Sequence, residues 1–293
     1  MYTSLTTLQS RLERRARLLP APLKATVKAS RHAIDPPLRL LYRRGADREL
    51  SIPPSSIRLR SGAPGIRGYF DGGRDHADSI ERALAVVGRE IGEFTSVLDF
   101  GAGAGRMLRH LAGRNSNARY VGSDVDARAI GWAGKNLPAA EWVVNSFEPP
   151  LPFSDSTFDL VYSHSIFTHL DESTQFAWLD EIRRVSSLGG LAVLSFHGPS
   201  AYEKSRSGHA VSHSRSCSRR VADHGDLEVE GFIFEPYEVS RWDRRDFAGV
   251  SGQFGMSFHS HDYIRDKWSS GFKVRAVMPR AIGWQDIVIL ERT

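Results

Sequence analysis

Cysteine is nearly absent from this chain. One cysteine, Cys217, occurs among 293 residues. A single thiol cannot close an internal disulfide, and it cannot build a metal site made of cysteines. No stretch approaches the roughly 18 consecutive apolar residues of a membrane-spanning helix. The first residues also lack the apolar segment of a secretory signal, so we expect a cytoplasmic protein.

Acidic residues are scarce in the first 60 residues. This segment holds 13 Lys and Arg against 4 Asp and Glu, so the remaining 233 residues carry a net charge of −4. We expect a basic helical N-terminal extension and linker over residues 1–75, with its helical patches broken by prolines. Residues 1–60 would contact an anionic membrane at its inner face. A solvated arm without a ligand is an equally good interpretation.

Apolar segments and amphipathic segments alternate through the rest of the chain. Strands are expected at residues 96–100, 120–123, 141–145, 158–164, 191–196, 272–278 and 285–291. Helices are expected at residues 79–93, 106–113, 126–136 (capped by Asp126), 173–187 and 261–269. Strands and helices that alternate in this way form a parallel sheet with crossover helices. We therefore expect one α/β domain over residues 76–293, with an insertion at about 199–262 before the last two strands.

Three glycines follow the first of these strands, in the segment VLDFGAGAGR at residues 97–106. A glycine-rich turn after a parallel strand lets a ligand approach the backbone closely. Dinucleotide sites use the pattern Gly-x-Gly-x-x-Gly. Here position 106 is arginine, and the third glycine is Gly105. An acid, Asp99, also precedes the glycines.

The segment VLDFGAGAGR resembles the first motif of class I S-adenosylmethionine-dependent methyltransferases. Further segments resemble later motifs of this family in the same order: YVGSDVD (120–126), FDLVYSHSIFTHL (158–170), FAWLDEIRRVSSLGGLAVLSFHG (176–198) and GWQDIVILERT (283–293). The resemblance implies a Rossmann-like seven-stranded sheet, mostly parallel with the last strand antiparallel, and S-adenosylmethionine as the cofactor. Shorter segments, such as IFTHL and SFHG, are similar to bacterial methyltransferases associated with glycosyltransferases and polysaccharide loci.

The resemblance assigns roles to the residues around the glycine loop. Gly101, Gly103 and Gly105 would let the methionine portion of the cofactor lie against bare backbone. Asp99 would order the loop and hold the cofactor's ammonium group through water. Helix capping is the alternative role for this carboxylate.

The ends of the next three strands supply the remaining cofactor-binding candidates. Asp124 would accept hydrogen bonds from both ribose hydroxyls, and Val125 would pack on the adenine. Asn145 and Ser146 would read the adenine amino edge, although a polar loop is nearly as good an interpretation. Ser163 ends the fourth strand and would line the crevice.

Histidines are the candidate bases for an acceptor hydroxyl. Methyl transfer needs the acceptor aligned with the methyl–sulfur bond, and a hydroxyl benefits from a base within hydrogen-bond reach. His164, His197, His259 and His261 are the candidates. The insertion at 199–262, with aromatic residues such as Trp242, would form a lid over a small-molecule or glycan acceptor.

Several other reactions do not fit the sequence. Amino methylation favours an Asn/Asp-Pro-Pro-aromatic turn after the fourth strand, and this chain has Ser-His-Ser-Ile there. Cytosine methylation needs a cysteine nucleophile at a position that Cys217 does not occupy, and no acids cluster for a metal site. Two alternatives remain: an RNA or protein methyltransferase that uses the basic arm, with nucleic acid the less favoured partner, or a cofactor-binding protein without activity.

Overall fold

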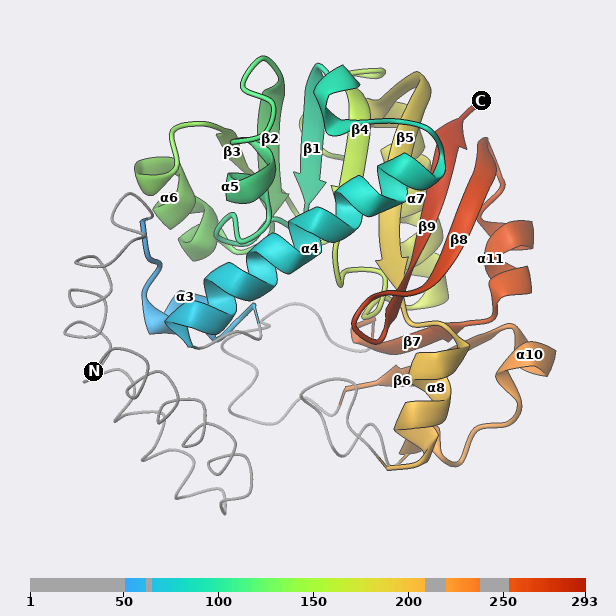
Figure 1. Cartoon of the computed structure of the whole chain (residues 1–293). Helices are drawn as coiled ribbons and strands as arrows, with labels where there is room; N and C mark the ends of the chain where they lie inside the picture. The colour runs from blue at the N-terminus through green and yellow to red at the C-terminus, as the bar shows by residue number, and fades with distance from the viewer. Residues whose placement is uncertain (1–50, 62–64, 209–219, 238–252) are drawn as a thin grey trace, which may run out of the picture.

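The computed structural model describes residues 51–61, 65–208, 220–237 and 253–293 (Figure 1). The expected helical arm at 1–50 lies outside these residues, as do Cys217 and Trp242. The basic arm and its membrane contact therefore remain predictions. In the described segments, no helix is long and apolar enough to cross a membrane.

Seven strands form the central sheet, in the order β3-β2-β1-β4-β5-β9-β8. Their bounds are β1 Ser96–Phe100, β2 Arg119–Asp124, β3 Glu141–Val144, β4 Phe158–Ser163, β5 Ser186–Phe196, β8 Phe272–Ile282 and β9 Gln285–Arg292. Strands β1 to β5 run parallel, and β9 is antiparallel to both β5 and β8. This arrangement confirms the expected seven-stranded, mostly parallel sheet with an antiparallel last strand.

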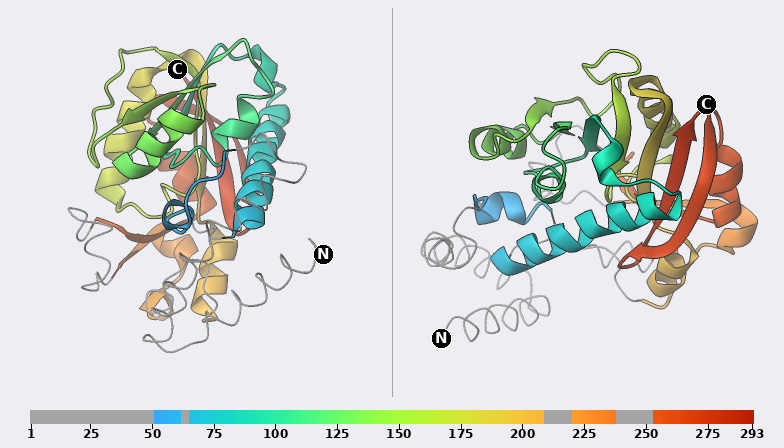
Figure 2. Two further views of the ribbon diagram at one scale, coloured as in Figure 1. Left: turned by 90° about the vertical axis from the view of Figure 1, so that its left-hand side faces the viewer. Right: turned by 45° about the horizontal axis from the view of Figure 1, so that its top comes forward.

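Helices cover both faces of the sheet (Figure 2). Successive side chains of a strand point to opposite faces, so a strand covered on both sides is apolar throughout. Strand β1 has apolar residues on both faces: Val97 packs in the core against helix α4 (Ile66–Val86), whereas Leu98 and Phe100 pack in the core beneath helix α7 (Glu172–Val185). The sheet is thus buried on both faces, and ligands can reach it only at the ends of its strands, which form its amino and carboxyl edges.

Helix α4 differs most from the sequence-based expectation. It spans Ile66–Val86, whereas the sequence predicted a linker over 51–75 and a helix over 79–93. The predicted domain boundary at residues 75 and 76 falls inside this helix. The first half of α4 was not predicted because it contains Gly72 and Gly73, and glycine lowers helix propensity by about 1 kcal/mol per residue.

The two glycines of α4 bring it close to the glycine loop. A Cβ atom on Gly73 would lie 2.3 Å from the carbonyl oxygen of Arg106, and one on Gly72 would lie 2.3 Å from the Arg106 guanidinium. The Tyr69 hydroxyl donates to the carbonyl of Ala104 at 3.2 Å. The first half of α4 therefore covers the loop that follows β1.

The insertion forms a small layer with its own core. It contains α8 (Pro199–Arg206), α10 (Leu227–Glu230) and the antiparallel pair β6 (Phe232–Pro236) and β7 (Gly255–His259). Its buried apolar residues are Ala201, Tyr202, Val221, Leu227, Ile233, Met256 and Phe258. Figure 1 shows this layer beneath the carboxyl ends of β4 and β5.

Backbone hydrogen bonds tie the insertion to the residues that follow β4 and β5. The N–H of Gly255 donates to the carbonyl of His169 at 2.8 Å, and the N–H of His259 donates to that of His197 at 2.9 Å. The insertion therefore lies against the carboxyl edge of the sheet, where parallel α/β sheets bind their ligands.

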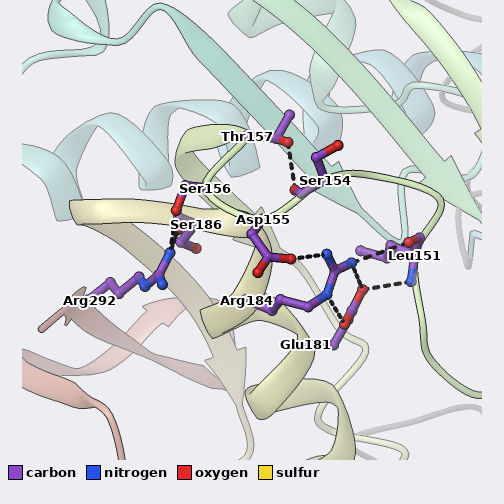
Figure 3. Close-up of polar contacts among 9 residues, drawn as sticks. All are labelled: Leu151, Ser154, Asp155, Ser156, Thr157, Glu181, Arg184, Ser186 and Arg292. Atoms are coloured by element: carbon purple, nitrogen blue, oxygen red, sulfur yellow. Dashed lines mark hydrogen bonds and ion pairs between the residues drawn. The ribbon is translucent and has the colours of Figure 1, made fainter.

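The opposite, amino-terminal edge of the sheet is closed by ion pairs (Figure 3). Arg184, in the last turn of α7, contacts Asp155 at 2.7 Å and Glu181 at 2.6 Å. Glu181 is buried, and it accepts from the N–H of Leu151 at 2.6 Å. This cluster fixes the connection between β3 and β4 to helix α7.

Candidate active site

The glycine loop follows β1 in a conformation that only glycine adopts readily. Gly101, Gly103 and Gly105 have φ angles of 87°, 54° and 68°, a region that L side chains disfavour. The N–H groups of Gly101 and Ala102 both donate to the carbonyl of Ser123 at 2.9 Å. Strand β2 thus holds the loop through its backbone.

One of the three glycines leaves open space beside it. A Cβ atom on Gly101 would meet Ile166 at 2.4 Å, and one on Gly105 would meet Trp142 at 2.5 Å. A Cβ atom on Gly103 would have only a carboxylate oxygen of Asp124 within reach, at 4.0 Å. The bare backbone of Gly103 is therefore the part of the loop that a ligand can approach.

Asp124 ends β2 and orders the loop. Its Oδ2 accepts from the N–H of Gly103 and its Oδ1 from the N–H of Asp126, both at 2.7 Å. Burial raises the pKa of Asp124, and these two hydrogen bonds partly offset the effect. Each carboxylate oxygen keeps a second lone pair for a ligand hydroxyl. The predicted ribose contact is thus compatible with this geometry.

Asp126 caps helix α6 (Ala127–Asn136), as expected. It accepts from the N–H groups of Arg128 and Ala129 at 3.1 and 3.3 Å. Its second oxygen pairs with Arg60 Nε at 2.7 Å. The segment before α4 therefore lies across the same end of the sheet, which the sequence analysis did not anticipate.

Asp99 is the most deeply buried carboxyl group of the crevice. It is 3% exposed, and burial raises its pKa to about 8. The charge of Asp124 raises this pKa further, while the neighbouring Tyr162 hydroxyl lowers it. No cation of the described segments lowers it. Burying a carboxylate costs free energy unless a cation compensates it, so this position favours a positively charged ligand.

Several buried polar atoms at this edge have no protein partner in the segments described. They are Ser123 Oγ, Asn145 Oδ1, Ser163 Oγ and His76 Nδ1. The two serines and Asn145 end or follow β2, β3 and β4, so they surround the glycine loop. Buried polar atoms are normally hydrogen-bonded, so unpaired ones gathered in a crevice fit a polar ligand.

Val125 and Ser146 lie beside this crevice. Val125 follows Asp124 and is 51% exposed, which is high for an apolar side chain. Ser146 is exposed, and its carbonyl accepts from Asn145 Nδ2 at 2.7 Å. Both positions are open to an aromatic base, so their predicted adenine contacts remain predictions.

His164 and His197 follow β4 and β5, as expected, but neither has a carboxylate partner among the described residues. His164 lies 4.2 Å from His76 of α4 between ring centres, and burial holds its pKa well below the usual value. His197 is 2% exposed, and burial lowers its pKa to about 3. Its Nδ1 lies 3.3 Å from the carbonyl of Ser257. Both rings are weak bases that stay neutral near pH 7.

His261 has a different environment. Its Nε2 lies 2.6 Å from Oδ2 of Asp286, which is 1% exposed. A carboxylate acceptor fixes the proton on Nε2, which leaves the lone pair on Nδ1. A Cβ atom on Gly198, at the end of β5, would lie 3.2 Å from His261 Nε2. The pair therefore stands at the carboxyl end of β5.

The sequence analysis missed Asp286 and His76. Asp286 belongs to the GWQD segment, which was used only as a family resemblance, and no periodicity distinguishes a buried acid in a strand. His76 fell at the border of the presumed linker. Within the described ranges, no three His, Cys, Asp or Glu side chains gather in a metal-binding arrangement.

Comparison with known proteins agrees with this geometry. Residues 97–190 match the family described as "Methyltransferase domain". An uncharacterised methyltransferase of Synechocystis sp. is 33% identical over 105 residues, which are 36% of this chain and 48% of that protein. The chain thus spans about half the length of this curated relative.

Solved structures agree on the fold. An S-adenosylmethionine-dependent methyltransferase from Mesorhizobium loti superposes with a TM-score of 0.50 at 17% identity, over 73% of this chain and 98% of that one. The chain thus shares the fold of this S-adenosylmethionine-dependent methyltransferase. The residues around Gly103 and Asp99 fit S-adenosylmethionine. This cofactor carries a sulfonium and an ammonium group, which suit a buried carboxyl group, and two ribose hydroxyls, which suit the free lone pairs of Asp124.

Proposed function

We propose that this protein transfers a methyl group from S-adenosylmethionine to a hydroxyl group of a small molecule or glycan. One observation carries the hydroxyl acceptor: His261 is oriented by a buried carboxylate, at the same sheet edge as the glycine loop. Amino groups need no such base when they are already neutral, whereas a hydroxyl group must lose its proton during transfer.

The crevice residues would hold the cofactor. Gly103 offers bare backbone, and Asp124 offers lone pairs to the ribose hydroxyls. Asp99 would be ionised beside the cofactor's positive charge, which restores the ordinary acidity of this carboxyl group. The unpaired Asn145 Oδ1 would accept a hydrogen bond from its polar rim, and Ser163 Oγ would accept or donate one.

S-adenosylmethionine supplies an activated methyl group on sulfur. When that methyl group passes to the acceptor oxygen, His261 Nδ1 would accept the hydroxyl proton. Asp286 would stabilise the resulting imidazolium, because its carboxylate already accepts the hydrogen bond from Nε2.

The insertion at 199–262 would cover the acceptor. Its β7 strand is hydrogen-bonded to the segments that follow β4 and β5, and His261 follows β7 directly. The Tyr237 hydroxyl lies 2.9 Å from His169 Nδ1. This contact places an aromatic side chain of the insertion beside the segment that follows β4. Exclusion of water around the reacting groups strengthens the electrostatic interactions there.

Calorimetry and an acceptor screen test this proposal. The protein should bind S-adenosylhomocysteine, and labelled S-adenosylmethionine should transfer its methyl group to glycans or their precursors with free hydroxyls. Binding of NAD without binding of S-adenosylhomocysteine would refute the proposal. Transfer that persists fully in His261→Ala would refute the assignment of the base.

A further inference from the structure

Two cations and one indole ring form a cluster where the β8–β9 hairpin meets helix α8. Lys204 Nζ lies 3.9 Å from the ring centre of Trp284, and the guanidinium carbon of Arg280 lies 4.6 Å from it. Lys204 comes from α8, so the cluster joins the insertion to the hairpin. Trp284 is 38% exposed, which is high for tryptophan in a folded domain.

A bulge in β8 positions Arg280. Between the pairs Met278–Ile287 and Ile282–Gln285, three residues of β8 face only Asp286 of β9. Arg280, in the middle, has a φ of 52°, which is uncommon for a residue other than glycine and costs free energy. Bulges and strained residues concentrate at ligand sites, where they re-aim a side chain.

Asp286 links this bulge to the proposed base. Its Oδ1 accepts from the N–H of Arg280 at 2.8 Å, and its Oδ2 lies 2.6 Å from His261 Nε2. One buried carboxylate thus sets the position of both the imidazole and the bulge. Arg280, one member of the cationic cluster, is thus joined to the proposed base through its backbone N–H.

The two cations have no carboxylate partner in the segments that the structure describes. No ion pair of Lys204 or Arg280 occurs there, although many other arginines of the chain are paired. An aromatic face attracts a cation, but it leaves the N–H donors of lysine and arginine unused.

Resting on the function proposed above, we infer that the methyl acceptor is anionic. Its phosphate or carboxylate group binds Arg280 and Lys204 beside the Trp284 ring, and its hydroxyl group faces His261. Arginine and lysine donors are the usual partners of both anions. The indole face adds an apolar surface against which a sugar ring or an aromatic ring can lie.

Four probes separate the anion from the sugar: pyrophosphate, glucose 1-phosphate, glucuronate and glucose. Calorimetry at low ionic strength compares the wild type with an Arg280→Gln/Lys204→Gln double variant. Arg275→Gln is the matched control, because Arg275 lies on the same strand but pairs with Glu291. At least one charged probe should bind the wild type at least tenfold more tightly than glucose, and the double variant should lose at least tenfold of that affinity. Arg275→Gln should change it by less than about twofold.

The results decide both the chemistry and the inference. A preference for glucose 1-phosphate and pyrophosphate identifies a phosphate, and a preference for glucuronate identifies a carboxylate. Equal binding of all four probes, or equal binding by the wild type and the double variant, overturns the inference. Titration with S-adenosylhomocysteine separates the two proposals: its failure to bind removes the methyltransferase, whereas intact binding without anion selectivity removes only the anionic acceptor.

Discussion

The amino and carboxyl ends of the strands in the central sheet differ in how their polar groups are paired. At the amino edge, Asp159 accepts from Thr95 N, Thr95 Oγ1 and Ser96 N at 2.7 to 2.9 Å. At the carboxyl edge, Ser163 Oγ and Asn145 Oδ1 stay buried without a partner. The Ser96 hydroxyl is an exception at the amino edge, since it too is unpaired.

This difference separates stability from binding. Polar groups that are paired within the chain stabilise the fold, whereas buried groups without partners reduce its stability until a ligand compensates them. Variants at the amino edge should therefore affect unfolding, and variants at the carboxyl edge should affect ligands or turnover. Three substitutions test this separation in order of decreasing effect, and the ionisation of Asp99 then tests it through pH.

The largest effect is expected from His261→Asn, at the carboxyl edge. Loss of the base should lower kcat by about 10²-fold or more, while the Kd for S-adenosylhomocysteine changes less than about threefold. Single-turnover kinetics and calorimetry measure the two quantities. The matched control is His224→Asn, since His224 also pairs with a carboxylate, Glu235, but within the insertion. Equal losses in both variants would contradict a specific role for His261.

Asp124→Ala should weaken cofactor binding by about 1–3 kcal/mol, because the ribose hydroxyls and the N–H of Gly103 lose a charged acceptor. Calorimetry with S-adenosylhomocysteine measures the change. Asp155→Asn, at the amino edge, removes an exposed carboxylate and serves as the control with unchanged affinity. Similar affinity losses in the two variants would break the distinction between the edges.

Arg184→Met, at the amino edge, should lower the free energy of unfolding by about 1–3 kcal/mol. The substitution leaves the buried carboxylate of Glu181 without its cation, and an unpaired buried charge is destabilising. Urea unfolding measures the loss, and the Kd for S-adenosylhomocysteine should stay within about twofold. A variant that binds the cofactor poorly yet unfolds normally would contradict the assignment of this edge to stability.

Asp99 should also make the stability of the protein depend on pH. Its folded pKa of about 8 lies above the unfolded value of 3.8, so ionisation in the free protein opposes folding. The free energy of unfolding should therefore decline as pH rises from about 4 to 8, and Asp99→Asn should remove this contribution.

Cofactor affinity should show the opposite trend. A cation prefers the ionised carboxyl group, so affinity for S-adenosylmethionine should rise between about pH 6.5 and 8.5, and Asp99→Asn should flatten the curve. Calorimetry across this range provides the test. Affinity that is independent of pH in the wild type would show that the carboxyl group does not face the cofactor's charge.

Much of the fold could be predicted from the sequence because its signals are local. The apolar residues Val97 and Leu98, followed by three closely spaced glycines, identify a strand and its turn without knowledge of the partner strands. Asp126 was likewise predicted as a cap, because the capping hydrogen bonds span only three residues. The start of helix α4 was predicted wrongly, because its two glycines are poor helix formers. They occur there since a larger side chain at Gly72 or Gly73 would clash with Arg106.

The site could be predicted only in part, for the same reason. Asp124 follows a strand at a recognisable distance from the glycines, so its place was clear. The pairing of His261 with Asp286 joins residues 25 positions apart on different elements. The packing of His76 on His164 joins a helix to a strand end far along the chain. Such contacts depend on the tertiary fold, which no local pattern encodes.

Gly72 and Gly73 let helix α4 approach the glycine loop closely. Because no side chain separates Gly72 and Gly73 from Arg106, the helix lies at nearly the smallest height above the glycine loop that two backbones allow. A single methyl group at Gly73 would have to lift the helix or displace the loop. The height of α4 above the glycine loop is therefore set by two residues that have no side chains.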